Sequence, residues 1–559
     1  MKESDLKKLV LKYTLQNAVF YDGKANEGAV LGKVLASQSQ LRKDVASVKK
    51  VISDVVKDVN KLSFEEQKKK LEGVDPKMLK KVVKVEEVLP ALPEAHEGKV
   101  VTRFAPAPTG PLNIAHVLRA VFINYEYAKM YKGKFLLRLE DTDPTKIKKE
   151  YYDWIKLDLT HLGVKWDKLI IQSERMNDYY KVAEHLIREK KMYVCICSQE
   201  KFKQSKIKKQ NCQCRESDSL DMWEKMLSGK LKEGQAVVRL KTSMSDPNPA
   251  LRDPAMLRIS HEEHPLQKRK YFVWPLYNFA VTVEDYKEKI THVFRGKEHE
   301  HNTSIQKKLY KIMGWKMPVF INFGMIYFSG EKLHTRDIKN MIERKEVSGW
   351  DDPRLRTVQA LLRRGFQPEA FRQCALGCGL SKTDIKFEFE KLENANRKIV
   401  DSIANRYMVV ISPVVIKIEN LLKQAKMKKG GNLKIQKHPE KPATKTVPLG
   451  KHVYISESDA KTFKGKEVRL MELFNVKIDK KTTLAKDYNK FSPKTQKIQW
   501  VSEPNVNVKI LMPGNQITAI GENSMKELKP GDIIQMIRVG FARVEKVTSK
   551  EVTVVFAHK

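Results

Sequence analysis

The stretch VVTRFAPAPTGPLNIAHVLRAVFINYEYAKMYKGKFLLRLEDTDP at residues 100–144 decides the fold. It begins with a short β-rich run, passes through the turn PAPTGP and continues with apolar residues at a helical period: Ile114, Val117, Leu118, Val121, Phe122 and Tyr125. We expect Gly133 to end this helix and FLLRL to form the next strand. Strand, turn, helix and strand make a βαβ unit, which predicts an α/β, Rossmann-like nucleotide-binding sheet.

The rest of the chain divides into regions that differ in composition and in the spacing of apolar residues. Val48, Val51, Ile52, Val55 and Val59 recur at helical spacing in a charged N-terminal segment. Strands and helices alternate around residues 271–328, and β-branched residues dominate after residue 409. We therefore predict six parts: a helical N-terminal extension (1–95), two halves of a nucleotide-binding domain (96–194 and 266–345), an insertion between them (195–265), a helical connecting domain (346–408) and an all-β, barrel-like region (409–559).

The composition favours a nucleic-acid partner. The 559 residues contain 106 Lys and Arg against 68 Asp and Glu, a net charge of +38, and such a surplus suits a polyanion. Basic surfaces throughout a Lys-rich chain are the simpler alternative. The N-terminus does not resemble a secretory signal, and no apolar run reaches the 18 residues of a membrane span. Six cysteines in so long a chain favour a reducing, cytoplasmic compartment over a disulfide scaffold.

The turn at residues 103–116 is a candidate phosphate site. Thr109, Gly110, Asn113 and His116 cluster where the predicted helix begins. A helix N-terminus offers unpaired N–H groups and the positive end of a dipole, which suit a triphosphate. A polar cap on a core helix explains the same residues equally well.

The pattern R-F-A-P-x-P-T-G-x-L-x-I-x-H resembles the first catalytic stretch of the class I glutamyl- and glutaminyl-tRNA synthetases. Their His-Ile-Gly-His element corresponds here to Asn113-Ile114-Ala115-His116. The resemblance implies that Thr109, Gly110, Asn113 and His116 bind ATP, with Mg²⁺ on the phosphates, and that Asn113 and His116 act in catalysis. Asn113 cannot donate as a cation, and Ala115 adds a methyl group where ATP approaches.

A second stretch, LLRLEDTDP at residues 136–144, resembles the family's strand that ends in an acidic substrate-binding residue. By position that residue is Glu140, which is implied to hold the α-ammonium group of the amino acid. For Asp141 and Asp143 we favour turn and helix-cap chemistry.

A third stretch, residues 274–303, resembles the family's amino-acid pocket. Tyr277 is implied to line it, and Arg295 and Arg103 to bind carboxylates. Two guanidinium groups suit the two carboxylates of glutamate, which favours glutamate over glutamine. Surface ion pairs are the alternative for each arginine. His299 either edges the pocket or is structural.

The second ATP loop of the family falls on Lys332-Leu333-His334-Thr335-Arg336. Lys332 and Arg336 are implied to be the cations that stabilise the pyrophosphate leaving group. A basic surface loop is the alternative. The run Trp350-Asp351-Asp352-Pro353-Arg354 also resembles a run in the archaeal and eukaryotic glutamyl enzymes and in the glutaminyl enzymes, where it implies a structural junction near the tRNA.

Four cysteines predict a metal site independently of the family. Cys195-x-Cys197 and Cys212-x-Cys214 offer four thiolates, which can close a tetrahedral structural zinc site. Four free or buried thiols are the alternative. Lysines between the two pairs suggest contact with the tRNA acceptor end. The other two cysteines, Cys374 and Cys378, fit a helical core better than a site.

Taken together, the resemblance implies an archaeal-type glutamyl-tRNA synthetase over residues 100–410. Its expected reaction is the ATP-dependent ligation of L-glutamate to tRNA(Glu), and also to tRNA(Gln) if the enzyme is non-discriminating, through a glutamyl-adenylate, by a monomer. The β region, with 10 Lys and 2 Glu at residues 416–451, is implied to form anticodon-binding barrels, where Tyr488 and Phe491 are candidate base contacts. A glutaminyl-tRNA synthetase and a catalytically impaired tRNA-binding paralogue are the alternatives.

Overall fold

The chain forms two compact units, Met1–Val88 and Leu89–Lys559. The computed structural model describes residues 3–21, 23–38, 40–41, 44–79, 89–328, 335–427, 431–490, 492–493 and 495–559. Among these residues, no helix is long and apolar enough to cross a membrane.

The N-terminal unit is a helical bundle with its own core. It contains α1 (Glu3–Phe20), α2 (Glu27–Ser37), α3 (Val45–Val59) and α4 (Phe64–Val74), followed by the 3₁₀ turn Pro76–Leu79. On α3, Val48, Ile52, Val56 and Val59 are buried against the other helices. The apolar period in the sequence therefore marks a face that packs within this unit.

The second unit begins with the parallel sheet that the sequence predicts. Strands β1 (Val101–Phe104), β2 (Lys134–Leu139) and β3 (Lys168–Ile171) are parallel neighbours, and β8 (His292–Gly296) pairs in parallel with β9 (Val319–Phe323). Hydrogen bonds between Val101 and Thr291 join the β1 edge to the start of β8. The chain order thus reverses between β1 and β8, the place where sheets of this type bind ligands.

The helix after β1 is interrupted, in contrast to the continuous helix predicted for residues 114–131. It consists of α5 (Ile114–His116), a π-helical turn (Val117–Val121) and α6 (Phe122–Met130). A π turn inserts one extra residue into the helix and often lies at a functional site. Apolar side chains of α5, the π-helical turn and α6 still face the core, which is why the periodicity is visible in the sequence.

Gly133 does not end this helix in the predicted way. The helix ends at Met130, and the left-handed conformation is taken by Lys132, at φ 47°. A Cβ atom on Gly133 would lie 2.0 Å from the carbonyl oxygen of Val100. Glycine is required there because β1 and the start of β2 approach each other closely.

An antiparallel sheet carries the cysteine-rich insertion. Its order is β4 (Met192–Cys195), β5 (Val237–Leu240), β6 (Ala255–Ile259) and β7 (Val273–Pro275). The helices associated with it are α8 (Met176–Arg188), α9 (Gln199–Lys208) and α10 (Leu220–Leu227). The sheet thus includes strands on both sides of the predicted insertion limits, 195 and 265.

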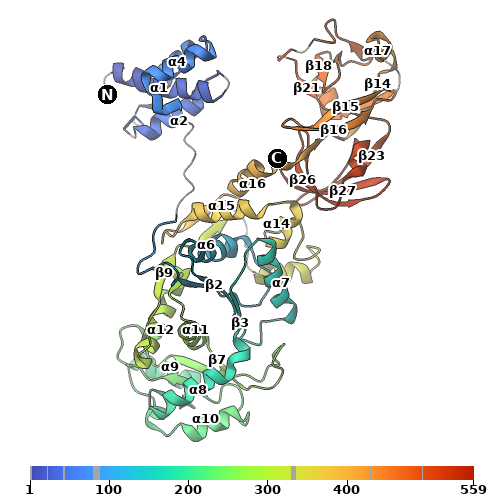
Figure 1. The fold of residues 1–559 in the computed structure, drawn as a ribbon. Coiled ribbons are helices and arrows are strands. Elements are labelled where there is room, and N and C mark those ends of the chain that lie inside the picture. The colour runs from blue at the N-terminus through green and yellow to red at the C-terminus, as the bar shows by residue number, and fades with distance from the viewer. Residues whose placement is uncertain are drawn as a thin grey trace. The chain divides into compact units, whose positions relative to one another are not determined.

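Helices α11 (Tyr277–Lys287) and α12 (Glu300–Met313) precede β8 and β9, respectively. Helices α13 (Thr335–Glu343), α14 (Val358–Arg364), α15 (Pro368–Cys378) and α16 (Glu390–Ile403) then lead from the sheet to the C-terminal region (Figure 1). The last three pack with α7 (Lys149–His161) and the nucleotide-binding sheet in one core. A short parallel pair, β10 (Ile326–Phe328) and β11 (Ile385–Phe387), also ties this region to the sheet.

The C-terminal region is mainly β and has two hydrophobic cores. In Figure 1 the orange part holds β14 (Pro413–Lys417) through β18 (Glu467–Leu470), and the red part holds β23 (Asn505–Leu511), β26 (Gly540–Val547) and β27 (Glu551–His558). A barrel-like sheet of seven strands surrounds the second core. The Lys-rich segment forms α17 (Glu419–Gln424) and the hairpin β15 (Asn432–His438) with β16 (Lys441–Pro448).

Candidate active site

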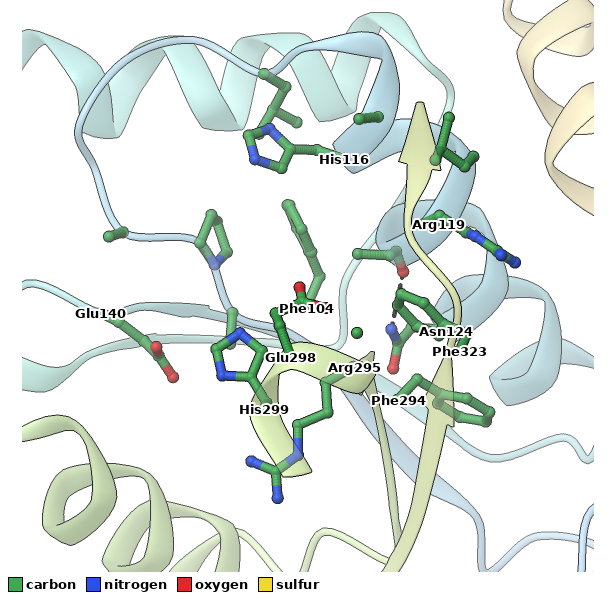
Figure 2. A pocket seen from close by; sticks show the side chains of 18 of the residues that line it. Phe104, His116, Arg119, Asn124, Glu140, Phe294, Arg295, Glu298, His299 and Phe323 are labelled. Atoms are coloured by element: carbon green, nitrogen blue, oxygen red, sulfur yellow. Dashed lines mark hydrogen bonds between the residues drawn. The ribbon is translucent and has the colours of Figure 1, made fainter. Parts of the chain in front are cut away.

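A cavity of 480 Å³ opens at the carboxyl ends of β1, β2, β8 and β9 (Figure 2). Ligands bind at this edge in open parallel sheets, because loops and helix N-termini converge there. Seven of the residues predicted from the sequence line it: Arg103, Thr109, Gly110, His116, Glu140, Tyr277 and Arg295. Residues that are far apart in the chain therefore meet around one space.

A buried charge network forms the floor of the cavity. Asp285 Oδ1 accepts hydrogen bonds from Arg138 Nη1 at 2.6 Å and from Arg103 Nε at 3.1 Å. Arg138 also holds Glu140 Oε1, with 3.0 Å to its Nη2. Burial raises the pKa of Asp285, but the two arginines outweigh it and hold this pKa below its usual value. The network fixes Arg103 and Glu140 at the cavity wall.

Arg295 lies inside β8, one residue before the strand ends, and is only 6% exposed. Its Nη2 donates to Thr303 Oγ1 at 2.6 Å, and its guanidinium lies 4.8 Å from the centre of the Phe320 ring. Neither Nε nor Nη1 has an acceptor with hydrogen-bonding geometry among the described residues. Burial lowers the pKa of Arg295, and the neighbouring Tyr277 opposes that shift. An unsatisfied buried guanidinium is costly, and a carboxylate would satisfy it.

At the opposite end of the cavity, His116 and Asn113 hold each other. Asn113 does not line the cavity. Its Oδ1 accepts from the backbone N–H of His116, and its own N–H donates to His116 Nδ1 at 3.3 Å, which makes a reciprocal helix cap. Burial lowers the pKa of His116 to about 4, so the ring is neutral at pH 7. Because Nδ1 accepts, the ring proton is on Nε2, and His116 is a hydrogen-bond donor.

The first segment predicted to bind ATP touches the end of the second one. A Cβ atom on Gly110 would lie 2.7 Å from Thr335 Cγ2 and 3.3 Å from the Trp350 ring. Thr335 itself lines the cavity, whereas the side chain of Arg336 is 86% exposed. Lys332 lies outside the described residues. The two predicted nucleotide elements therefore meet at Gly110, where a side chain would keep them apart.

Sequence reasoning missed several groups at the site. Arg138 and Asp285 hold the predicted residues in place, although both lie in stretches whose resemblance to the family points to other positions. Three further cavity residues are Arg119, Asn124 and Glu298. Glu298 closely follows Arg295, and proximity to a predicted carboxylate ligand was the signal that could have indicated it. His299, for which the sequence left a pocket role and a structural role open, also lines the cavity.

Asp141 differs from its predicted role as a turn or cap residue. It is fully buried and accepts hydrogen bonds from the Tyr152 hydroxyl and from both the N–H and the hydroxyl of Ser173, all within 2.7–2.8 Å. It therefore joins α7 to the segment after β3. Asp143 does have turn chemistry, since its Oδ1 accepts from the Thr145 hydroxyl at 2.7 Å.

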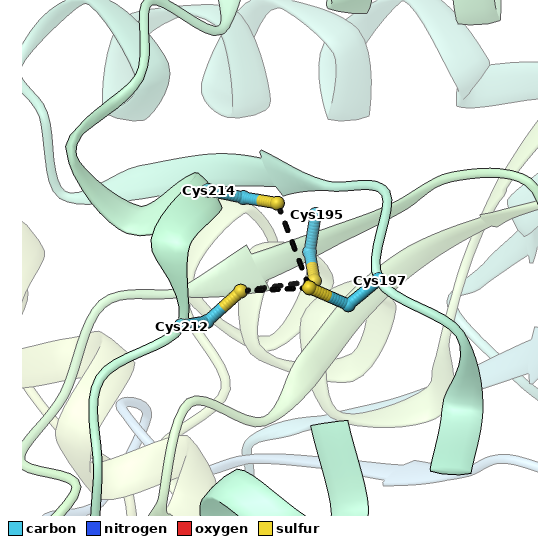
Figure 3. Close-up of side chains that lie close together, drawn as sticks. All are labelled: Cys195, Cys197, Cys212 and Cys214. Carbon is cyan, nitrogen blue, oxygen red and sulfur yellow. Dashed lines mark hydrogen bonds between the residues drawn. The ribbon is translucent and has the colours of Figure 1, made fainter. Parts of the chain in front are cut away.

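The four cysteines of the insertion gather at the end of β4 (Figure 3). Their sulfur atoms all lie within 4.8 Å of one another, and the three closest contacts are 3.2, 3.7 and 3.8 Å. Tetrahedral zinc with bonds of about 2.3 Å separates its thiolates by about 3.8 Å. The geometry and the donor set therefore fit zinc, which Cys195, Cys197, Cys212 and Cys214 would hold with no open position.

The chain matches two family models. Residues 99–402 match the catalytic domain of "tRNA synthetases class I (E and Q)", and residues 404–492 match the anti-codon binding domain of the same group.

Curated relatives cover the whole chain. Glutamate–tRNA ligases of Pyrococcus furiosus and Pyrococcus abyssi are each 40% identical over 99% of this chain and 100% of their own length. A solved glutamate tRNA ligase from Elizabethkingia meningosepticum, in complex with its amino acid, is 22% identical with a TM-score of 0.40, over 55% of this chain and 70% of that one. The chain belongs to the class I tRNA synthetases of the glutamate and glutamine group, in the family of the archaeal glutamate–tRNA ligases.

Proposed function

We propose that the chain ligates L-glutamate to tRNA in two steps that both use this cavity. A glutamate α-carboxylate oxygen attacks the α-phosphorus of ATP, and pyrophosphate leaves. The terminal ribose hydroxyl of tRNA then attacks the glutamyl carbonyl carbon, and AMP leaves. The observation that carries the proposal is Arg295, whose Nε and Nη1 have no acceptor among the described residues and which shares the cavity with Arg103.

The glutamate end is assigned to Arg103, Glu140, Tyr277 and Arg295. Only the Nε atom of Arg103 is engaged by a described side chain, so its outer N–H groups are available to a carboxylate. Arg295 offers its free N–H groups to the second carboxylate. Glu140 accepts from the ammonium group, and the Tyr277 ring closes the wall. Two guanidinium groups match a diacid, whereas the amide of glutamine would leave one of them unsatisfied.

The ATP end is assigned to Thr109, Gly110, His116, Lys332 and Arg336. The Nε2–H group of His116 donates to a phosphate oxygen, and the start of the helix adds N–H groups. Lys332 and Arg336 provide cations for the leaving pyrophosphate, together with Mg²⁺. Asn113 acts through His116 as a positioning residue, because its backbone N–H donates to His116 Nδ1 and fixes the orientation of the ring.

Zinc is assigned to the four cysteines as a structural ion that supports contact with the tRNA acceptor end. The lysines of α9 follow directly after Cys197. Cys212→Ser is expected to lower bound zinc below one equivalent and weaken tRNA charging, while glutamate-dependent pyrophosphate exchange persists. Metal analysis of the purified variant and the two activity assays measure this, and zinc content equal to wild type would refute the site.

The C-terminal region is assigned to the anticodon. A cavity of 530 Å³ lies beside the first of the two hydrophobic cores of this region, with the cations Arg406, Lys434 and Arg538 among its lining residues. Tyr488, proposed from the sequence, packs against the first of these cores, and Phe491 lies outside the described residues. Cations around a cavity of this size suit an unstacked nucleotide.

Aminoacylation with labelled glutamate or glutamine on purified tRNA(Glu) and tRNA(Gln) tests the proposal. Glutamate charging of tRNA(Glu) is expected, and charging of tRNA(Gln) as well would identify a non-discriminating enzyme. Preference for glutamine would establish the glutaminyl alternative. Intact tRNA binding without charging or pyrophosphate exchange would establish the impaired paralogue. We propose a monomer, which light scattering of the same sample tests.

A further inference from the structure

A chain of side-chain amides leads from the core to His299. Gln306 Nε2 donates to Asn278 Oδ1 at 3.1 Å, and Asn278 Nδ2 donates to Asn302 Oδ1 at 3.0 Å. Asn302 Nδ2 then lies 3.1 Å from His299 Nδ1. This series of amides starts at Gln306, which is 1% exposed, and ends at the half-buried ring of His299, which lines the cavity.

The direction of these hydrogen bonds fixes the proton on His299. An amide N–H group can only donate, so His299 Nδ1 accepts and its proton is on Nε2. The backbone at His299 is also held, since the Thr303 hydroxyl donates to its carbonyl oxygen at 3.1 Å. Thr303 is the residue that Arg295 contacts, so His299 and Arg295 share one support.

His299 lines the cavity beside the residues that we assign to glutamate. Its ring centre is 5.5 Å from that of Tyr277 at the glutamate end, and Figure 2 shows its ring beside Arg295. Burial lowers its pKa, Glu298 opposes that shift, and nearby cations add to it. The charged and titratable groups that face it are Arg103, Arg295, Glu298 and His301, and Tyr277 packs against its ring.

We propose that His299 is a catalytic residue that donates a hydrogen bond from Nε2 to an oxygen at the acyl–phosphate junction of the adenylate, and that Asn302 is the positioning residue that selects this tautomer. The inference rests on the proposed function. A neutral hydrogen-bond donor suits the position of His299, because a cation there would compete with Arg103 and Arg295 for the glutamate carboxylates. A donor fixed before the reaction stabilises developing charge without reorganisation.

Asn302→Asp tests the relay, because it exchanges a donor for an acceptor of the same shape. The carboxylate will accept from Nδ1–H, so the neutral ring has its lone pair on Nε2, and the pKa of His299 rises. The imidazolium has protons on both nitrogens, and the new carboxylate balances its charge, so the pair adds no net cation beside Arg103 and Arg295. Glutamate-dependent pyrophosphate exchange by the variant is therefore expected to fall about 100-fold at pH 8.5 and to recover as the pH drops toward 6. Wild type should show no such recovery.

Two further variants complete the test. Asn302→Ala leaves His299 free to choose either tautomer, and a pH-independent loss of about tenfold is expected. His299→Phe removes the donor, and its activity should be low at every pH. Unfolding temperature and ATP binding, measured for all three, identify a variant that is merely misfolded.

The outcomes separate this inference from the proposed function. If wild type charges tRNA with glutamate but pyrophosphate exchange by Asn302→Asp follows the wild-type pH profile, the relay is refuted while the proposed function stands. Full activity of His299→Phe would equally overturn it. If Asn302→Asp does not fold, ¹⁵N chemical shifts of His299 in wild type decide, since a proton on Nδ1 would contradict the assignment. Wild type without any glutamate-dependent exchange would refute the proposed function itself.

Discussion

Buried charges are handled differently in the catalytic cavity and in the C-terminal β region. Lys445 and Glu522, both buried, form an ion pair in the β region. Lys445 also donates to the Arg406 carbonyl oxygen at 2.5 Å, and Glu522 accepts from the Met408 N–H and the Ser524 hydroxyl. Arg295 is equally buried, yet two of its nitrogens have no acceptor among the described residues.

The difference indicates which buried charges serve structure and which serve a ligand. A charge whose hydrogen bonds are complete stabilises the fold, and removing its partner is strongly destabilising. A charge with open donors costs stability, which is expected where a substrate completes the pairing. Variants at the two places should therefore separate activity from stability.

The largest effect is expected for Arg295→Ala. It removes a guanidinium that we assign to a glutamate carboxylate, so kcat/KM for glutamate should fall about 10³–10⁴-fold, or about 4–5 kcal/mol. The free energy of unfolding should be unchanged or higher, because the unsatisfied N–H groups are lost. Steady-state charging and denaturant unfolding measure the two effects. Arg295→Lys, which keeps the charge but not the planar fork, should recover only part of the activity.

Glu522→Gln should show the reverse pattern. It leaves Lys445 buried without a counter-charge, so the free energy of unfolding should fall by about 3 kcal/mol. Glutamate-dependent pyrophosphate exchange at 25 °C should stay within about twofold of wild type, as neither residue lines the catalytic cavity. A loss of exchange without a loss of stability would break the comparison.

Asp158 is a buried charge whose hydrogen bonds are only partly made, and its contribution to the free energy of unfolding is expected to depend on pH. It is buried, its Oδ2 accepts from the Leu112 N–H at 2.9 Å, and burial raises its pKa to about 7. A raised carboxyl pKa favours the folded state below about pH 4, and that contribution is lost as the pH rises to 7. Asp158→Asn keeps a hydrogen-bond acceptor but carries no charge. At pH 8 it is expected to raise the free energy of unfolding by about 2 kcal/mol, a gain that structural relaxation limits, and at pH 4 it is expected to leave it unchanged. Denaturant unfolding at both pH values measures this; equal effects would contradict it.

Gly110→Ala is expected to have the smallest effect, and it acts on the ATP end. Its Cβ would meet Thr335 Cγ2 at 2.7 Å, so Thr335 must move at the end of the segment that we assign to ATP. KM for ATP should rise about tenfold, or about 1.4 kcal/mol, with KM for glutamate unchanged. Pyrophosphate exchange with varied ATP is the measurement. Gly163→Ala, at a left-handed position with open space around it, is a control for general strain.

The sequence predicted the parallel sheet and most of the cavity wall because both depend on local patterns. The apolar period after Ile114 and the runs around Arg103 and Arg295 are read from neighbouring residues. It did not predict the π turn, since one inserted residue leaves that period almost intact. It left a helix cap and an ATP contact as alternatives for Asn113, because capping depends on backbone geometry.

The partners of the charged residues were also beyond the sequence. Asp285 lies 182 positions from Arg103, and no local pattern relates the two. The same holds for the amide chain, which joins two helices at Asn278 and Asn302. Pairing over such separations is set by how the strands and helices pack.

Binding of a non-hydrolysable glutamyl-adenylate analogue, measured by titration calorimetry, tests the central claim most directly. We predict one site per chain in wild type, at least about 10³-fold weaker binding in Arg295→Ala, and much weaker binding of the glutaminyl analogue to wild type. Equal affinity of wild type and Arg295→Ala for the glutamyl analogue would contradict the assignment of this cavity to glutamate.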